Sequence, residues 1–146
     1  MGEKLMICRN QELLKYIPQR PPIVMIDSLH SAKPDEFIGG LQIQESNLFV
    51  ENQTFSEAGI LEHIAQTAAA GTGYLCAQEK KPVQKGFIGQ IKKVNFFRLP
   101  KVKENICTCI QITAQVFDVS IIKATVSIGE ECIATGEMKI FLQPEN

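Results

Sequence analysis

Three polar side chains, Glu62, His63 and Gln66, interrupt a stretch of small and apolar residues that runs from position 58 to position 75. A carboxyl group in dry surroundings can give or take a proton during a reaction. Gln66 follows Glu62 by four positions, so in a helix its amide lies on the same face and can orient the carboxyl group or a water molecule. We predict Glu62 as a general acid or base and Gln66 as a substrate-binding residue. The alternatives are a glutamate that reaches solvent or pairs with a lysine at an interface, and a helix-capping or interface amide.

His63 is the second catalytic candidate because it directly follows Glu62. Successive helix residues point about 100° apart, so the two side chains reach one atom more easily across a dimer than within one subunit. The alternative is a buried histidine with a satisfied hydrogen bond. The other histidine, His30, lies in residues 28–34 and is interpreted as a surface loop residue.

The element that carries these candidates is a helix predicted over residues 57–76. Ser56 is suited to cap its N-terminus, and Glu57 suits the positive end of the helix dipole. The segment is apolar on nearly all sides, which predicts burial. Gly71 and Gly73 either permit close backbone contact or weaken the last turns.

The elements around this helix are mostly strands. A short helix about residues 10–17 ends at a run of prolines, and residues 78–85 around Pro82 form a polar loop. Alternating or continuous apolar runs predict strands, with the last three joined as an antiparallel meander. These strands cover residues 23–29, 37–43, 87–97, 105–117, 120–128 and 131–142, and residues 47–55 are irregular or a short strand. One sheet around one helix is an α+β fold, here a single domain over residues 1–146. One helix cannot cover a broad sheet, so we expect oligomers.

Composition excludes several function classes. The 146 residues are 45% apolar, and 15 basic residues against 16 acidic ones give a net charge of −1, which argues against a nucleic-acid partner. The sequence contains no run of about 18 apolar residues, so no membrane span is predicted. Residues 1–9 lack the features of a signal peptide, so a cytoplasmic location is expected. The five cysteines and two histidines have no metal-ligand spacing, which predicts no metal site and buried thiols.

Three motifs occur in order between residues 13 and 142. LKYIPQRPP begins at residue 14, GILEHIAQ at residue 59 and VNFFRLP at residue 94. Each resembles a segment of the FabZ-type 3-hydroxyacyl-[acyl-carrier-protein] dehydratases: the N-terminal signature, the start of the central helix and the F-x-R-P segment. The resemblance implies a hotdog fold, in which an antiparallel sheet wraps a central helix. It also implies a dimer or a dimer of dimers, with acyl tunnels near the subunit interface and Glu62 as the family glutamate.

The histidine that serves this family as catalytic base has no counterpart here. Residues 49–59 are shorter than the family segment and contain neither histidine nor proline, and Asn52, Gln53 and Thr54 stand in that region. We predict that these three side chains bind substrate by hydrogen bonds. Gly59 can bring its N–H to a thioester oxygen, or it is a packing glycine. With its shortened segment and LEHIAQT helix, the chain more closely resembles divergent dehydratase-like proteins of aryl-polyene and related pigment pathways.

The resemblance implies a hydro-lyase that dehydrates carrier-bound 3-hydroxyacyl thioesters in fatty-acid or polyene-type biosynthesis, without a cofactor. The missing histidine leaves two alternatives open. One is a hotdog acyl thioesterase, in which Glu62 and Gln66 position water. The other is a non-catalytic acyl-binding subunit that pairs with an active dehydratase. The partners expected are an acyl carrier protein and a second copy of the chain, or that dehydratase subunit. A cluster of basic residues could dock the acidic carrier protein or be a solvated face; it comprises Lys92, Lys93, Arg98, Lys101 and Lys103.

Overall fold

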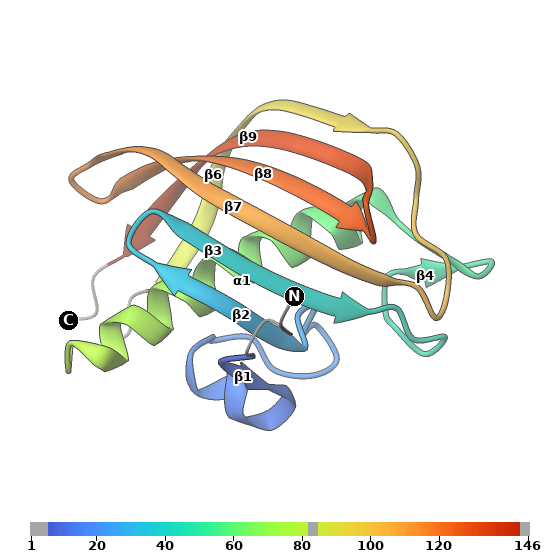
Figure 1. Ribbon diagram of the computed structural model, residues 1–146, viewed down its shortest axis with the longest axis horizontal. Helices are drawn as coiled ribbons and strands as arrows, with labels where there is room; N and C mark the ends of the chain where they lie inside the picture. The colour runs from blue at the N-terminus through green and yellow to red at the C-terminus, as the bar shows by residue number, and fades with distance from the viewer. Residues whose placement is uncertain (1–5, 82–84, 144–146) are drawn as a thin grey trace.

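A computed structural model describes residues 6–81 and 85–143 of the chain. In this part of the chain, a seven-stranded antiparallel sheet curves around one long helix, α1 (Glu57–Gln78) (Figure 1). The strand order is β1-β2-β3-β7-β8-β9-β6. The strands of this sheet are β1 (Cys8–Arg9), β2 (Ser28–Lys33), β3 (Glu36–Gln42), β6 (Lys85–Phe96), β7 (Asn105–Val116), β8 (Val119–Ile128) and β9 (Glu131–Gln143). The predicted α+β arrangement is confirmed.

The long helix begins where the sequence predicts. The Ser56 hydroxyl accepts a hydrogen bond from the Gly59 N–H at 3.1 Å, which satisfies one of the free donors of the first turn. The helix continues two residues beyond the predicted end at position 76. Ile60, Ile64 and Ala68 lie on its inner face and pack in the main core, so the sheet wraps the face that carries the largest apolar side chains.

Strand alternation sets the inner and outer faces of the sheet. In β7, Ile106, Thr108 and Ile110 are buried, whereas Cys107 is exposed and Cys109 is partly exposed. Residues one apart point to opposite faces, so these two cysteines share the outer face. The prediction that the thiols are buried is therefore wrong: of the five cysteines, only Cys8 is buried.

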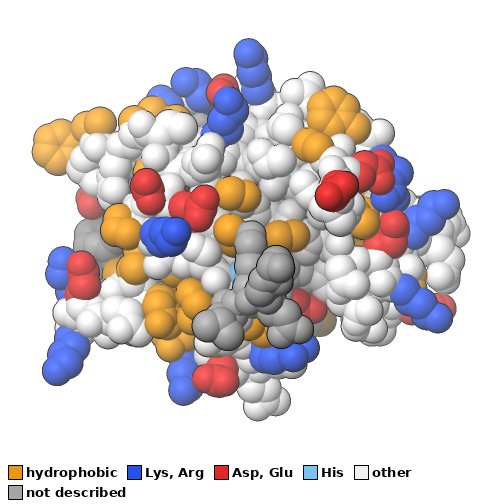
Figure 2. Space-filling model, in the orientation of Figure 1, with side chains coloured by type: hydrophobic (Ala, Val, Ile, Leu, Met, Phe, Trp, Pro, Cys, Tyr) orange, Lys and Arg blue, Asp and Glu red, His pale blue; other side chains and the backbone are white. Residues whose placement is uncertain are grey.

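The predicted meander is confirmed, because β7 pairs with β8 and β8 pairs with β9, both antiparallel. Strand β6 then pairs with β9 and forms one edge of the sheet, at the far end from β1. At the turn between β7 and β8, hydrophobic side chains project from the left-hand end of the molecule (Figure 2), and Val116 and Phe117 there are 61% and 94% exposed.

The N-terminal part differs from the prediction. The short helix is a 3-10 helix, η1 (Asn10–Lys15), and ends two residues before the predicted boundary. Residues 23–27 are not part of a strand, and β2 begins only at Ser28. One reason lies in the backbone of Ile23 and Met25, which bonds to side chains of α1, as described below. Only Asp27, at the end of this segment, donates its N–H to the neighbouring strand, to Gly40 O at 2.9 Å. Strand β2 has a register shift between Leu29 and Ser31, where it pairs with β3.

A small hairpin precedes the helix. Strands β4 (Val50–Glu51) and β5 (Thr54–Phe55) pair with each other, and the turn residues Asn52 and Gln53 both have positive φ angles. The loop after β6 holds this hairpin through two backbone hydrogen bonds, Val102 N–H to Gln53 O and Phe55 N–H to Pro100 O. The hairpin and the start of α1 therefore form one unit with that loop.

Two sequence predictions lie partly outside the described residues: the N-terminal segment at residues 1–5 and the polar loop at Pro82. Within residues 6–81 and 85–143, no helix has both the length and the apolar character needed to cross a bilayer.

Candidate active site

Gln66 is the centre of the polar cluster on α1. Its side chain is buried, and its Oε1 accepts a hydrogen bond from the Met25 N–H at 2.6 Å. Its Nε2 donates to the Ile23 carbonyl and to Glu62 Oε2, each at 2.8 Å. Because a backbone N–H can only donate and a carbonyl can only accept, these partners fix the orientation of the amide. Gln66 therefore ties residues 23–25 to the helix and orients Glu62.

His63 binds the same segment from the next position on the helix. Its side chain is 0% exposed, and its Nδ1 lies 2.7 Å from the Met25 carbonyl oxygen. A carbonyl only accepts, so Nδ1 carries the proton and Nε2 of the neutral ring does not. Nε2 is buried and has no hydrogen-bond partner among the described residues. Burial lowers the pKa of His63 to about 4, although the bond to Met25 acts in the opposite direction.

Glu62 is the member of this cluster that reaches the surface. Its side chain is partly exposed in the second turn of α1, and one carboxylate oxygen is held by Gln66. Within this cluster of described residues, Gln66 bonds to Oε2 and not to the other oxygen, Oε1. The arrangement presents an oriented carboxyl group at the edge of a buried polar network, which suits proton transfer to a bound molecule.

The structure places the other predicted substrate-binding residues apart from this network. Asn52 and Gln53 are exposed at the tip of the β4–β5 hairpin, and Thr54 is partly exposed. Gln53 Nε2 donates to Glu45 at 3.4 Å, and the Thr54 hydroxyl donates to the Asn52 carbonyl at 3.3 Å. These contacts lie within the hairpin and its neighbours, and the role of the three residues in substrate binding stays a prediction.

The geometry at Gly59 supports the packing alternative. Its N–H already donates to the Ser56 hydroxyl. A Cβ at this position would lie 2.6 Å from the Phe55 ring and 2.8 Å from Phe49 Cβ. Only a glycine lets the start of the helix approach these two aromatic residues so closely, and the proposed contact with a thioester oxygen would have to compete with the cap.

His30 lies on the other face of the sheet from the helix. A Cβ at Gly39 would meet Thr67 of α1, whereas a Cβ at Gly40 would meet Ser28 Oγ and His30 Nε2. His30 is a strand residue of β2, not the loop residue expected, and its Nε2 lies 3.0 Å from the Ser28 hydroxyl. This pair lines an outer hollow of about 550 Å³. His30 therefore lies on the opposite face of the sheet from α1 and its Glu62 carboxyl group.

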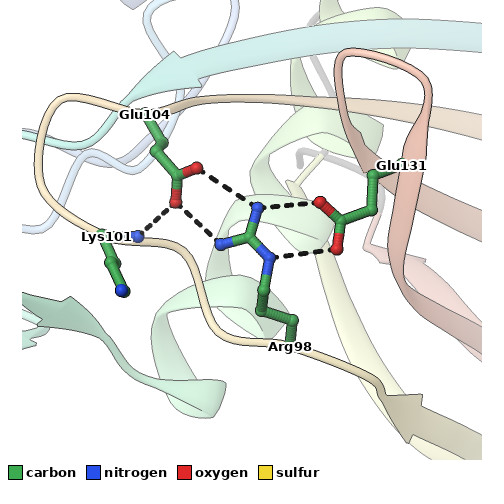
Figure 3. Close-up of polar contacts among 4 residues, drawn as sticks. All are labelled: Arg98, Lys101, Glu104 and Glu131. Carbon is green, nitrogen blue, oxygen red and sulfur yellow. Dashed lines mark hydrogen bonds and ion pairs between the residues drawn. The ribbon is translucent and has the colours of Figure 1, made fainter.

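The predicted basic cluster divides into two kinds of side chain. Lys92, Lys93, Lys101 and Lys103 are exposed. The Arg98 guanidinium instead lies between Glu104 and Glu131, with ion-pair distances of 2.9 and 3.0 Å (Figure 3). Arg98 is therefore engaged within the chain, and a carrier-docking surface would rest on the lysines. Among the described residues, no group of His, Cys, Asp or Glu side chains could hold a metal ion.

Sequence patterns identify the polar side chains of this site but not their partners. The partners Ile23 and Met25 act through backbone atoms, and they lie about 40 positions before Gln66 and His63. A run of apolar residues at 23–29 gives no sign that its backbone bonds to side chains. The sequence offered one general indication of such partners: polar side chains on a buried helix need hydrogen-bond partners.

The curved antiparallel sheet around one central helix is the hotdog fold. The chain belongs to the ApeP-like family: the model of the ApeP dehydratase matches residues 11–146. A comparison with curated protein sequences finds no significant match.

Solved structures share the fold at low sequence identity. The dehydratase heterocomplex ApeI:P from Xenorhabdus doucetiae matches with a TM-score of 0.84 and 13% identity, over 92% of this chain and 91% of that one. An HP0420 homologue from Helicobacter felis matches with a TM-score of 0.67 and 20% identity, over 93% and 90%. A hypothetical thioesterase from Streptococcus pneumoniae, solved with coenzyme A, matches with a TM-score of 0.64 and 8% identity, over 81% and 86%. These matches confirm the predicted hotdog fold.

Proposed function

We propose that the chain is one subunit of a 3-hydroxyacyl thioester dehydratase and supplies Glu62 to a site that a second hotdog subunit completes. One observation carries the proposal. The Glu62 carboxyl group is oriented by Gln66 at a partly exposed position, whereas His63 is fully buried with Nδ1 on the Met25 carbonyl, and His30 Nε2 lies by the Ser28 hydroxyl on the outer face of the sheet. The chain therefore offers one acid–base group where dehydration uses two.

The reaction removes water from a 3-hydroxyacyl thioester. A base takes the proton from the carbon next to the thioester carbonyl, the electron pair forms the new double bond, and the hydroxyl group leaves. Glu62 gives its proton to that hydroxyl, so that water departs, and the partner's base holds the proton from carbon. After water has left, Glu62 lacks the proton that the partner's base has gained, so the total charge of the two groups is unchanged. Transfer of that proton from the base to Glu62 restores the starting state.

His63 acts in this proposal as a positioning residue rather than as the base. Its side chain is 0% exposed, and its Nδ1–H holds the Met25 carbonyl. Burial also lowers its pKa to about 4, which makes it a weak proton acceptor at neutral pH. The catalytic role predicted from its place beside Glu62 is thus less well supported than that of Glu62 itself.

Pairing with a different subunit is supported by two observations. A similar fold occurs in a dehydratase heterocomplex from Xenorhabdus doucetiae. In this chain, β6 is a twelve-residue edge strand with no further strand beside it in the described residues, and its Ile91 is 44% exposed. Long edge strands that carry apolar side chains are templates for pairing with another chain. We propose β6 as the surface where the second subunit docks, in preference to a homodimer.

The substrate is proposed to arrive on an acyl carrier protein. Carrier proteins are acidic, and the lysines on β6 and the following loop are exposed and can steer such a partner. These are Lys92, Lys93, Lys101 and Lys103. Replacing pairs of them should slow association more at low salt than at high salt, because screening weakens such attraction.

A paired assay tests the proposal. The chain is purified alone and with a FabZ-type subunit that keeps its loop histidine, and both preparations receive 3-hydroxyacyl-carrier substrate. We expect enoyl absorbance only from the pair, and a loss of at least about 100-fold in kcat for Glu62→Gln, the usual range for a general acid. Glu57→Gln, an exposed glutamate in the first turn of the same helix, is the matched control and should keep its activity.

Other outcomes would replace the proposal. Free thiol release by the chain alone would identify a thioesterase. Full activity of the pair with Glu62→Gln would leave the chain as a non-catalytic partner. Enoyl formation by the chain alone would show that no second subunit is needed and would restore a catalytic role for its own histidines.

A further inference from the structure

Arg98 is held by two carboxylates at once. Its Nε and Nη2 donate to the two oxygens of Glu131, each at 3.0 Å. Its Nη1 and Nη2 donate to the two oxygens of Glu104 at 2.9 and 3.2 Å (Figure 3). These bonds lower the pKa of both carboxyl groups, Glu104 chiefly through Arg98 and then the Lys101 N–H. Bidentate pairs of this kind fix geometry as well as charge.

The three charged residues belong to three different strand ends. Arg98 follows β6, Glu104 immediately precedes β7, and Glu131 is the first residue of β9. Glu104 Oε1 also accepts a hydrogen bond from the Lys101 N–H at 2.8 Å. The set of Arg98, Glu104 and Glu131, here named the Arg98 clamp, therefore fixes both ends of the loop at residues 97–104.

This loop in turn holds the β4–β5 hairpin. Val102 N–H donates to Gln53 O at 3.0 Å, Phe55 N–H donates to Pro100 O at 2.8 Å, and Thr54 forms a β-bridge with Lys101. Phe55 immediately precedes Ser56, the cap of α1. The loop contains Lys103 at a φ of +79°, a conformation that a lysine adopts only where its surroundings impose it.

We propose that Arg98 is a positioning residue for the Glu62 site. The clamp fixes the loop at residues 97–104, the loop fixes the β4–β5 hairpin, and the hairpin sets the first turns of α1. The hairpin leads directly into Ser56, the cap of α1, and Glu62 lies in the second turn of that helix, so the position of the hairpin bears on the position of Glu62. The catalytic part of this inference rests on the proposed function, whereas the structural part does not.

Amide hydrogen exchange of the complete chain tests the structural part. Arg98→Gln and the milder Glu131→Gln are compared with Glu130→Gln, an exposed glutamate in the same turn. Exchange at the Phe55 and Val102 amides reports on the hairpin. Exchange at the Ile112 amide, which bonds Asp35 O at the other end of β7, reports on global opening. We expect exchange at Phe55 and Val102 to accelerate about tenfold more than exchange at Ile112 in both clamp variants, and no difference in Glu130→Gln.

The paired enzyme tests the catalytic part. Glu131→Gln should lower kcat for the carrier-bound substrate while KM changes less than twofold, because Glu62 is misplaced but the docking surface is kept. Equal acceleration at all three amides would show that the clamp supports only global stability and would overturn the inference. Local loosening with an unchanged kcat would overturn the link to Glu62. If the wild-type pair is inactive, the proposed function fails, and the exchange data still decide whether the clamp positions the hairpin.

Discussion

At the scale of single residues, His63 is a fully buried histidine on α1, as in the alternative that the sequence left open for it. His63 keeps one ring nitrogen on the Met25 carbonyl and leaves the other without a partner in the described part of the chain. Protonation would place a charge in surroundings that offer no second acceptor, which explains why burial lowers its pKa to about 4. The residue is therefore neutral under physiological conditions, and its neutrality is part of what stabilises the fold.

The protonation of His63 gives stability a defined pH dependence. In the unfolded chain its pKa is near 6.5, and in the folded chain it is about 4. The unfolded state therefore binds more protons between these values, so the stabilisation is present above about pH 6.5 and is lost as pH falls toward 4. We expect the free energy of unfolding, measured by urea titration, to drop by about 2 kcal/mol between pH 7 and pH 5 because of this group.

The variant His63→Asn isolates this effect. Its amide can still donate to the Met25 carbonyl but does not titrate, so the drop between pH 7 and pH 5 should largely disappear. His30→Asn is the control for the other histidine and should retain the drop. Identical pH dependence in His63→Asn and the wild-type chain would show that His63 is not the group responsible.

Sequence patterns located the residues of this site better than their interactions. Glu62 and Gln66 stand out because polar groups on an apolar helix need partners, and their spacing of four correctly predicted their contact. The bonds of Gln66 and His63 to Ile23 and Met25 were not predictable, because they use backbone atoms that carry no residue-specific signal. Tertiary packing, not local pattern, brings these segments together.

At the scale of elements, α1 is shaped by close approach at its glycines. A Cβ at Gly71 would overlap the Phe37 ring, and a Cβ at Gly73 would overlap the carbonyl of Tyr16. The sequence left open whether these glycines permit contact or weaken the helix. The structure decides for contact, since the end of η1 lies directly against the last turns of α1. That contact buries Leu13 and Ile17 in the smaller of the two apolar clusters.

Substitution at Gly73 tests this packing. Alanine is the better helix former by about 1 kcal/mol, so propensity alone predicts that Gly73→Ala stabilises the chain. The overlap is with backbone, which cannot rotate away, and we therefore expect a net loss of about 2 kcal/mol in the free energy of unfolding. Gly129→Asn is the control: its φ is +59° and its surroundings are open, so its unfolding midpoint in urea should change little. A midpoint for Gly73→Ala at or above the wild-type value would contradict the packing argument.

The sequence predicts best those elements whose apolar residues recur with one clear spacing. The capped helix and the β7–β8–β9 meander follow from apolar spacing and turn residues, and their boundaries lie within about two residues of the prediction. Residues 23–27 were misread because an apolar run looks the same whether a strand or a helix side chain satisfies its backbone. Solvent exposure of the cysteines on β7 was misread because small apolar residues were assumed to face inward.

At the scale of the whole molecule, the sheet formed by the described residues has one long edge strand, β6, that pairs on one side only. Strand β1 at the other edge contains only two residues, whereas β6 contains twelve and carries exposed apolar and basic side chains. Such an edge is costly for an isolated protein because it invites pairing with other chains. A second hotdog subunit that continues the sheet at β6 would remove this cost and bring its own acid–base group close to Glu62.

Ile91 gives a direct test of this assembly. It is 44% exposed on β6, so Ile91→Glu should leave the isolated chain folded, with an unchanged melting temperature. At the subunit interface, however, the new carboxylate would lose its water without gaining a partner. We expect the dissociation constant for the FabZ-type subunit, measured by light scattering and titration calorimetry, to rise at least about tenfold, because hot-spot positions carry this much or more.

The matched control is Val116→Glu, which places the same charge on an exposed apolar strand residue at the β7–β8 turn. It should leave the dissociation constant within about twofold of the wild-type value, as for surface positions outside an interface. If Ile91→Glu associates normally and Val116→Glu does not, the second subunit docks at the β7–β8 turn instead. Glu62 would then lie beyond the reach of a base donated across β6, and the chain would serve as a support for its partner rather than as half of its active site.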